Sequence, residues 1–170
     1  KNGHSLDDLV TLGLISSKNK NDIYSSRIIF PIKTISGRTV GFGARVLENS
    51  GKSAKYINSP DSSIYNKSKI LYGLYKSKTH IVKSDNCYIV EGYTDVIRFH
   101  QKGLPNVVSS SGTALTFGQI NSIRRLTKNI TMLFDSDKAG FNATIRSIDM
   151  ILSQGMNVSI CIFPKNEDPD

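Results

Sequence analysis

Short apolar runs alternate with amphipathic segments in the second half of the chain. The runs predict strands at residues 87–91, 106–110, 130–134 and 157–163. In the segments between them, apolar residues recur three or four positions apart, which is the spacing of one helix face. This alternation predicts an α/β fold with a mainly parallel four-stranded sheet and helices on both of its faces.

Three helices are predicted between these strands. The first covers residues 94–102. The second begins at Thr116 and Gln119, which form a T-x-x-Q capping box that satisfies free N–H groups of the first turn. The third ends at Gly155, and its predicted apolar face consists of Phe141, Ile145, Ile148 and Leu152.

The first half of the chain is less regular and predicts a mixed α/β lobe. A short helix is expected at residues 6–14. A hairpin is expected from strands at residues 27–32 and 38–46, with its turn at Ser36 and Gly37. The polar stretch 48–66 is predicted to be loop, and the segment around Leu71 to be helical. Because the composition changes near residue 85, we expect two domains, 1–85 and 86–170.

The positive charge of the chain lies in its first half. The net charge at pH 7 is +8. Residues 1–85 contain 14 Lys and Arg against 6 Asp and Glu, whereas residues 86–170 contain 8 of each kind. This asymmetry predicts that the first half binds a polyanion. A lysine-rich solvated surface is the alternative that composition leaves open.

Composition argues against several classes of protein. No apolar run approaches the ~20 residues that a membrane-spanning helix needs, and the acidic start of the chain is unlike a signal peptide. Cys87 and Cys161 lie in apolar runs and are predicted to be buried thiols of a cytoplasmic protein. The three histidines lack zinc-ligand spacing. Because Lys1 and Asp170 resemble cut points, we expect a fragment.

Acidic residues follow three of the four predicted strands. Glu91 ends the first, Asp135 and Asp137 follow the third, and Asp168 and Asp170 follow the fourth. Right-handed crossovers bring the carboxyl ends of parallel strands to a single edge of the sheet, where open α/β sheets bind their ligands. We therefore expect these five carboxylates to converge.

A group of converging carboxylates predicts a metal site. Like charges a few ångströms apart repel, and cations neutralise them. Oxygen ligands of this kind suit Mg²⁺ or Mn²⁺, and a pair of such ions promotes phosphoryl or nucleotidyl transfer. Taken alone, D-x-D, D-P-D and E-G-x-x-D are each commonly turns or helix caps. Their convergence is what favours a metal site.

Four segments together resemble the TOPRIM domain, which bacterial primases share with topoisomerases and some nucleases. They are EGYTD at 91–95, SSGTALT at 110–116, DSDKAG at 135–140 and EDPD at 167–170. Upstream, RIIFPI, GRTVGFGARVL and KYINSPDSSIYNKSKILYGLY resemble the lobe that precedes TOPRIM in bacterial DNA primases of the DnaG type. From Arg27 onwards, nearly the whole chain is similar to the RNA polymerase core of that family.

The resemblance implies roles for the acidic residues. Glu91, Asp135 and Asp137 match the catalytic metal-binding acids, with Glu91 as a further candidate for a general acid or base. Asp168 and Asp170 match an additional acidic pair near the metals. The family usually has glycine between the two aspartates of the D-x-D motif, where this chain has Ser136. That side chain puts the fine geometry of the metal site in doubt, although both carboxylates remain.

Other matched residues would support this site. Gly92 would permit a tight turn beside the metals. Asp95 would either support the site from behind or simply cap a helix. Gly112 and Thr113 would shape the floor of the crevice or form a merely structural turn. Ala44 stands where the primase G-F-G-G-R pattern has glycine.

Polar residues of the first half match the basic motifs of primases. They are Arg45, Lys55, Asn58 and Lys67. A template-directed polymerase needs cations for the template backbone and for the incoming triphosphate. Arg38 as a phosphate contact and Tyr56 as a base-stacking residue stay open. Each of these side chains has the alternative of a solvated surface position.

The resemblance implies a cytoplasmic DNA primase that joins ribonucleoside triphosphates on a single-stranded DNA template. It further implies an N-terminal zinc-binding module and a C-terminal module that binds the replicative helicase, both outside this sequence. A TOPRIM nuclease or topoisomerase is one rival function, against which the upstream lobe argues. A non-catalytic DNA-binding TOPRIM module is the other, and the retained acids argue against it.

Overall fold

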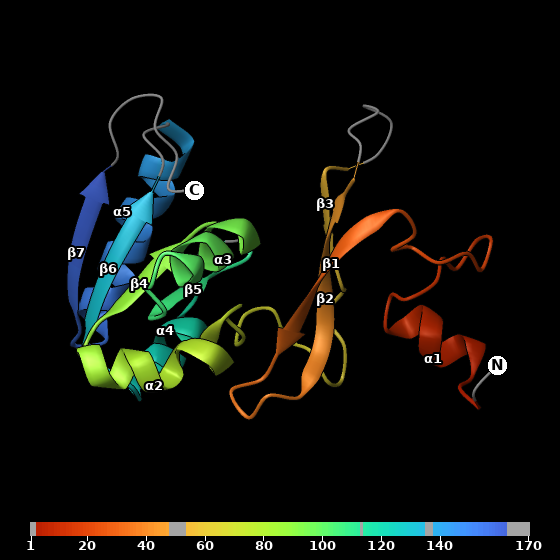
Figure 1. Cartoon of the computed structure of the whole chain (residues 1–170), viewed down its shortest axis with the longest axis horizontal. Helices are drawn as coiled ribbons and strands as arrows, with labels where there is room; N and C mark the ends of the chain where they lie inside the picture. Colours follow the sequence, from red (N-terminus) through yellow and green to blue (C-terminus); the bar gives the residue numbers. More distant parts are fainter. Residues whose placement is uncertain (1–2, 48–53, 113, 135–137, 163–170) are drawn as a thin grey trace. The chain divides into compact units, whose positions relative to one another are not determined.

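The computed structural model describes residues 3–47, 54–112, 114–134 and 138–162 (Figure 1). The chain divides into two compact units. Unit 1 comprises residues 1–32 and 39–66, and unit 2 comprises residues 33–38 and 67–170. The tip of the predicted hairpin thus belongs to unit 2, together with the second half of the chain. The domain boundary expected at residue 85 stays a prediction.

Unit 1 contains a short helix and a three-stranded sheet. The helix is α1 (Leu6–Thr11), and the sheet has the order β1 (Arg27–Lys33), β2 (Thr39–Val46), β3 (Tyr56–Asn58). Between β1 and β2, the N–H of Gly37 donates to the carbonyl of Thr34 at 2.9 Å. The predicted hairpin turn is therefore confirmed.

Strand β3 corrects the prediction of a loop at residues 48–66. It pairs antiparallel with β2, so that Ile57 lies opposite Ala44. A strand of three residues is too short to show a clear alternation of polar and apolar positions, and its polar neighbours favoured a loop instead. Ala44 is fully buried, so its methyl group fits into the core.

Unit 2 is built on a parallel four-stranded sheet. The strands have the order β5 (Val107–Ser109), β4 (Cys87–Val90), β6 (Asn129–Phe134), β7 (Asn157–Ile162). All three neighbouring pairs are parallel. The helices of this unit are α2 (Leu74–Ser84), α3 (Tyr93–Gln101), α4 (Phe117–Arg124) and α5 (Lys138–Ser153). The predicted α/β architecture is confirmed.

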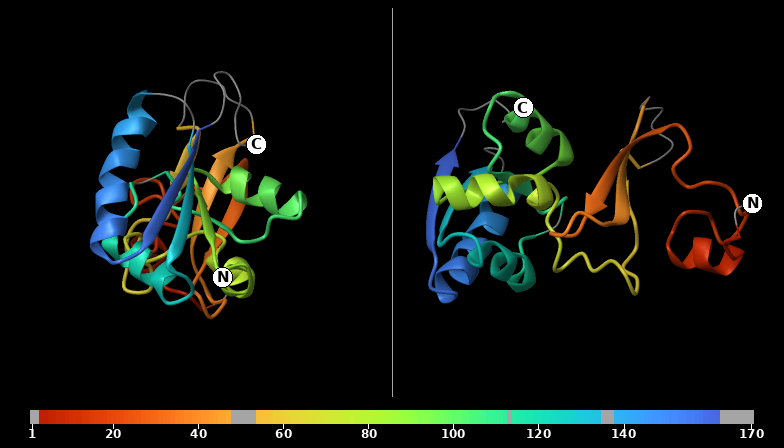
Figure 2. Two further views of the ribbon diagram at one scale, coloured as in Figure 1. Left: turned by 90° about the vertical axis from the view of Figure 1, so that its left-hand side faces the viewer. Right: turned by 60° about the horizontal axis from the view of Figure 1, so that its bottom comes forward.

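Helices cover both faces of this sheet, as Figure 2 shows for α3 and α5. Successive strand residues point to opposite faces, so neighbours in sequence enter different cores. Val90 packs with Val96 of α3 on one face. Ile89 belongs to the larger core on the other face, with Ile120 of α4 and Ile151 of α5. Helix α2 lies beside the edge strand β5, and the Ser77 hydroxyl of α2 donates to the Val107 carbonyl at 2.7 Å.

The buried face of α5 agrees only in part with the predicted one, of which Ile148 packs against the core. Ile151 is fully buried, whereas Ile145 and Leu152 are 43% and 53% exposed. The polar residue Ser147, one turn before Ile151, is also buried. Because this helix has apolar residues on more than one face, the sequence predicted only part of the buried face.

The two cysteines also differ from the prediction. Cys87 is a free buried thiol at the start of the central strand β4, as expected. Cys161 is free but exposed, because its strand β7 lies at the edge of the sheet. An apolar run was thus a poor predictor of burial at the sheet edge. Within the described residues, no helix is both long and apolar enough to span a bilayer.

Candidate active site

Glu91 lies at the carboxyl end of the sheet of unit 2. It follows β4 directly, and its side chain is exposed. The neighbour of β4 in the sheet is β6, with Ile89 beside Met132, and Asp135 is the next residue after β6 in the sequence. The sheet order therefore puts the strand that precedes Glu91 beside the strand that precedes the predicted D-x-D motif.

The other predicted metal ligands lie outside the described residues. These are Asp135, Asp137, Asp168 and Asp170, and Thr113 and Ser136 lie outside them as well. Within the described part of the chain, no group of three His, Cys, Asp or Glu side chains is placed to hold a metal ion. The convergence of the five carboxylates stays a prediction.

The peptide bond between Glu91 and Gly92 is fixed at both of its ends. Its carbonyl oxygen accepts hydrogen bonds from the Ser109 hydroxyl at 2.6 Å and from the Gly112 N–H at 3.2 Å. Its N–H donates to Oδ2 of Asp95 at 2.7 Å. Three different parts of unit 2 thus hold the backbone beside the candidate catalytic acid.

Asp95 has the helix-capping role that was one of its two alternatives. It is the third residue of α3, and its carboxylate accepts the N–H of Gly92, the residue before the helix. A carboxylate in the first turn also interacts favourably with the helix dipole. The same hydrogen bond anchors the residue after Glu91, so capping and support of the site coincide in one contact.

The chain bends at Glu91 and Gly92, as expected, but this bend does not depend on a special conformation of Gly92. Its φ is −117° and its ψ is 171°, an extended conformation that any residue adopts. A Cβ atom at this position would lie 3.2 Å from Oδ2 of Asp95, so close approach of the carboxylate is what favours glycine here. Gly112, by contrast, has a φ of +78°, which does require glycine or a strained residue.

Three of the predicted binding residues lie together in unit 1. Arg45 of β2 is paired with Tyr56 of β3, and Asn58 lies two residues further along β3 on the same face. The guanidinium carbon of Arg45 is 5.7 Å from the centre of the Tyr56 ring. Lys55 precedes this strand and is exposed. The β2–β3 pair thus presents one cation over an aromatic ring, with a second cation next in sequence.

Lys67 belongs to unit 2, where its backbone is held by α4. The side-chain amide of Gln119 donates to the carbonyls of Lys67 and Ile70, each at 3.0 Å. The Thr116 hydroxyl donates to the carbonyl of Ser68 at 2.6 Å. The capping box predicted at Thr116 and Gln119 is confirmed, with both of its reciprocal hydrogen bonds present. Its second function as an anchor for residues 67–70 was missed, because no sequence pattern signals it.

A cationic cluster around Tyr75 was also missed. The amino groups of Lys33 and Lys78 lie 5.6 and 5.0 Å from the centre of its ring. Lys78 additionally donates to the carbonyl of Ile35 at 2.9 Å. A cavity of about 200 Å³ lies next to this cluster, with Lys33, Lys69 and Arg125 in its lining. These residues come from separate segments of unit 2, so sequence spacing could not bring them together.

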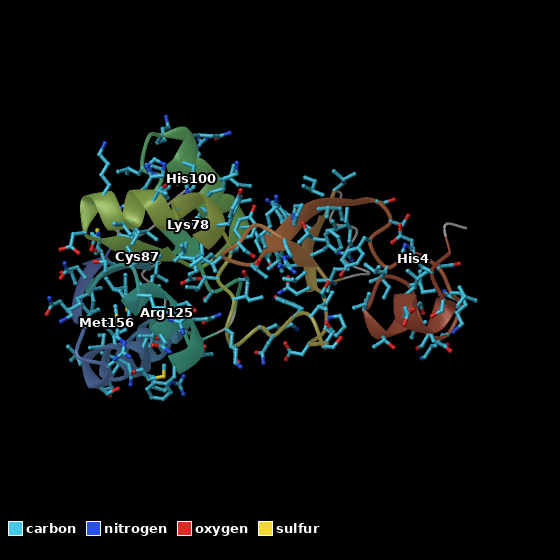
Figure 3. The ribbon with its side chains drawn as sticks, turned by 90° about the horizontal axis from the view of Figure 1, so that it is seen from below. His4, Lys78, Cys87, His100, Arg125 and Met156 are labelled. Atoms are coloured by element: carbon cyan, nitrogen blue, oxygen red, sulfur yellow. The ribbon has the colours of Figure 1, made fainter. Side chains whose placement is uncertain are left out.

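Burial shifts the pKa of several groups in unit 2 away from ordinary values. It raises the pKa of the Cys87 thiol, which therefore stays protonated. It also raises the pKa of Tyr72, whose ring packs edge-on against that of Tyr93 with 4.7 Å between the ring centres. Burial lowers the pKa of His100, a residue of α3 that lies beside α2 (Figure 3). All three shifts thus have the packing of this unit as their largest cause.

Two family models match successive parts of the chain. Residues 1–78 match the N-terminal domain of the DNA primase catalytic core, and residues 88–170 match a Toprim-like domain. The DNA primase of Staphylococcus aureus strain COL is 40% identical over 174 residues, which include all of this chain. The chain belongs to the DNA primase family.

Solved structures of primases agree with this assignment. The zinc-binding and RNA polymerase domains of the Aquifex aeolicus primase have a TM-score of 0.89 and 38% identity, over 96% of this chain and 41% of that one. A DnaG primase catalytic domain bound to single-stranded DNA has a TM-score of 0.89 and 33% identity, over 99% and 56%. The chain spans 29% of the length of the S. aureus primase. It therefore corresponds to part of the primase catalytic core.

Proposed function

We propose that this chain contributes the catalytic core of an enzyme that makes short RNA primers on single-stranded DNA. The observation that carries the proposal is the match of the first half to the primase catalytic core, followed by the match of the second half to a Toprim-like domain. A TOPRIM nuclease or topoisomerase would account for the second half of the chain but not for the first.

The proposed reaction is divalent-metal-dependent nucleotidyl transfer. The 3′-hydroxyl of one ribonucleotide attacks the α-phosphate of the next, and pyrophosphate leaves. Bound Mg²⁺ or Mn²⁺ would activate the attacking oxygen and neutralise charge on the leaving group. Glu91, Asp135 and Asp137 are the proposed catalytic ligands, and Asp168 and Asp170 the proposed additional pair.

The described part of the site fits such a metal. Glu91 offers hard carboxylate oxygens at the carboxyl end of β4. Its side chain is exposed, so a metal ion that keeps part of its hydration shell could reach it. The three hydrogen bonds to the following peptide group hold its backbone, so its side chain starts from a fixed direction of the Cα–Cβ bond.

Arg45, Lys55, Asn58 and Lys67 are the proposed contacts to template and nucleotide. An arginine held over the Tyr56 ring by a cation–π contact can still direct N–H donors to phosphate oxygens. Anchoring of the Lys67 backbone by Gln119 limits the conformations of that segment before it meets its ligand. The related DnaG domain with bound single-stranded DNA supports a DNA template.

The complete protein is proposed to be a cytoplasmic replication enzyme. Ribonucleoside triphosphates are its proposed substrates, and a replicative helicase is a proposed partner of a segment outside this chain. The solved A. aeolicus primase structure includes a zinc-binding domain. A domain of that kind is proposed for the complete protein and not for this chain.

One incubation separates this function from its rivals. The full-length protein is mixed with single-stranded DNA, ribonucleotides and Mg²⁺, and the products are resolved on a denaturing gel. Short RNA that depends on the template is expected. Degraded template would identify a nuclease, and binding of the template without any product would identify a non-catalytic module.

A further inference from the structure

Ser109 is a buried residue that contacts the backbone of the candidate catalytic acid. It ends strand β5, has no exposed surface, and lies beside Val90 of the central strand β4. Its hydroxyl donates to the carbonyl oxygen of Glu91 at 2.6 Å. The same hydroxyl oxygen accepts the N–H of Ser111 at 2.8 Å. Both hydrogen-bonding functions of this side chain are therefore used within the protein.

These contacts act on the conformation of Glu91. The strand pairing of Val90 with Ser109 fixes the backbone before Glu91. The hydrogen bonds from Ser109 and Gly112, and the one to Asp95, fix the peptide group after it. Because a peptide group is planar, holding the groups on both sides of a Cα fixes its φ and ψ, and with them the direction of the Cα–Cβ bond. The Glu91 side chain therefore leaves the backbone in a set direction.

Ser109 also maintains the loop that carries Gly112. Ser111 has a φ of 63°, a left-handed conformation that is unfavourable for a residue with a side chain. Its N–H donates to the Ser109 hydroxyl, which stabilises this conformation, and the next N–H, that of Gly112, reaches the Glu91 carbonyl. Removal of one hydroxyl would therefore weaken two of the three hydrogen bonds to the Glu91–Gly92 peptide group.

We propose that Ser109 is a positioning residue, which orients the Glu91 carboxylate for divalent-metal binding through the backbone of Glu91. The proposal rests on the proposed function, in which Glu91 is a metal ligand. Groups that orient metal ligands commonly contribute about 10- to 100-fold to metal affinity or activity.

The chain offers a matched control for Ser109. Ser77 of α2 is likewise fully buried, and its hydroxyl also donates to a carbonyl of β5, that of Val107 at 2.7 Å. Val107 begins β5, whereas Ser109 ends it. Ser109→Ala and Ser77→Ala therefore remove similar buried hydrogen bonds at opposite ends of one strand, and only the first is expected to affect Glu91.

The test compares both variants in the full-length protein. Mn²⁺ affinity is measured by titration calorimetry without DNA, and the Mg²⁺ concentration for half-maximal primer synthesis is measured with single-stranded DNA. We expect Ser109→Ala to weaken Mn²⁺ binding and to raise the Mg²⁺ requirement by about tenfold, with the DNA Kd unchanged. Ser77→Ala should lower only the Tm. Equal metal affinities in the two variants would overturn the proposal.

A second pair of variants covers the case in which Ser109→Ala fails to fold. Asp95→Ala removes the hydrogen bond at the other end of the same peptide group, and Asp95→Asn keeps an oxygen that accepts it. The first should shift the metal requirement in the same direction, and the second should restore it. Wild-type metal affinity in Asp95→Ala would contradict the proposal. If the wild-type protein itself makes no primers, the proposed function fails, whereas the comparison of Mn²⁺ affinities still decides the role of Ser109.

Discussion

The guanidinium carbon of Arg45 lies 5.7 Å from the centre of the Tyr56 ring, across the pairing of β2 with β3. If Arg45 contacts a template phosphate, Arg45→Ala should weaken single-stranded DNA binding about fivefold at low salt. It should also reduce the slope of log K against log salt by about 0.7, the value for one phosphate contact on a single strand. Fluorescence anisotropy over a range of salt concentrations measures both quantities.

The control for this prediction is Arg27→Ala. Arg27 lies in the same unit and carries the same charge, but its guanidinium donates to the carbonyl of Ala54 at 2.9 Å. Removing it tests for a general effect of charge. If both variants lose the same affinity with the same change of slope, Arg45 has no specific contact with the template.

Gln119 connects helix α4 to the Lys67 segment and should contribute strongly to stability. Its side chain is fully buried, and Gln119→Leu would remove the amide that donates to the carbonyls of Lys67 and Ile70. We expect a loss of about 2 kcal/mol in the free energy of unfolding, measured by urea denaturation. Gln101→Leu at the exposed end of α3 is the control and should change stability little. Equal stability of the two variants would contradict the anchoring role.

The two cysteines should differ sharply in reactivity. Cys161 is exposed, whereas Cys87 is buried and its pKa is raised by that burial, so it lacks both access and thiolate character. In the described part of the chain, a thiol reagent such as DTNB should label Cys161 in the native protein and Cys87 after unfolding in urea. Cys161→Ser should abolish the native reaction of these two thiols. Rapid native labelling of the Cys161→Ser variant at Cys87 would contradict the described core.

His100 should make the stability of unit 2 depend on pH. Burial lowers its pKa, as do the nearby charges of His80 and Lys76, although a hydrogen bond with the Val107 backbone acts in the opposite direction. The unfolded state therefore binds a proton at a higher pH than the folded state. Stability from this residue is fully present above a pH of about 6.5 and falls as the pH drops below that value.

The measurement is the Tm between pH 5 and pH 8, with His100→Gln as the test variant. We expect the variant to show a smaller decrease of Tm at low pH than the wild type. His4→Gln, at an exposed position of unit 1, is the control and should leave the pH profile unchanged. A His100→Gln profile parallel to that of the wild type would reject the role of His100.

Two inner strands of unit 2 were predictable because they are largely buried. Strands β4 and β6 are each bounded by polar residues, so their apolar runs predicted both their existence and their approximate ends. The capping box of α4 was predictable for a different reason, since Thr116 and Gln119 interact locally in sequence. Glu91 at the end of β4 followed from the same reasoning.

The contacts that the sequence did not predict join distant segments. Ser109 meets Glu91 across 18 positions, and Gln119 meets Lys67 across 52. No periodicity relates such pairs, because they depend on how strands pair and where a loop crosses a helix. The exposed Cys161 shows a related limit, since an edge strand and a central strand have similar apolar sequences.

The central claim is that the acids following β4 and β6 catalyse nucleotidyl transfer, and Asp135→Asn tests it most directly. Primer synthesis by the full-length protein is measured with Mg²⁺, ribonucleotides and single-stranded DNA, with Asp149→Asn at an exposed position of α5 as the control. The claim predicts that Asp135→Asn loses activity by a factor on the order of 100 or more, with its Tm and its DNA Kd unchanged. Primer synthesis at the rate of the control would contradict it.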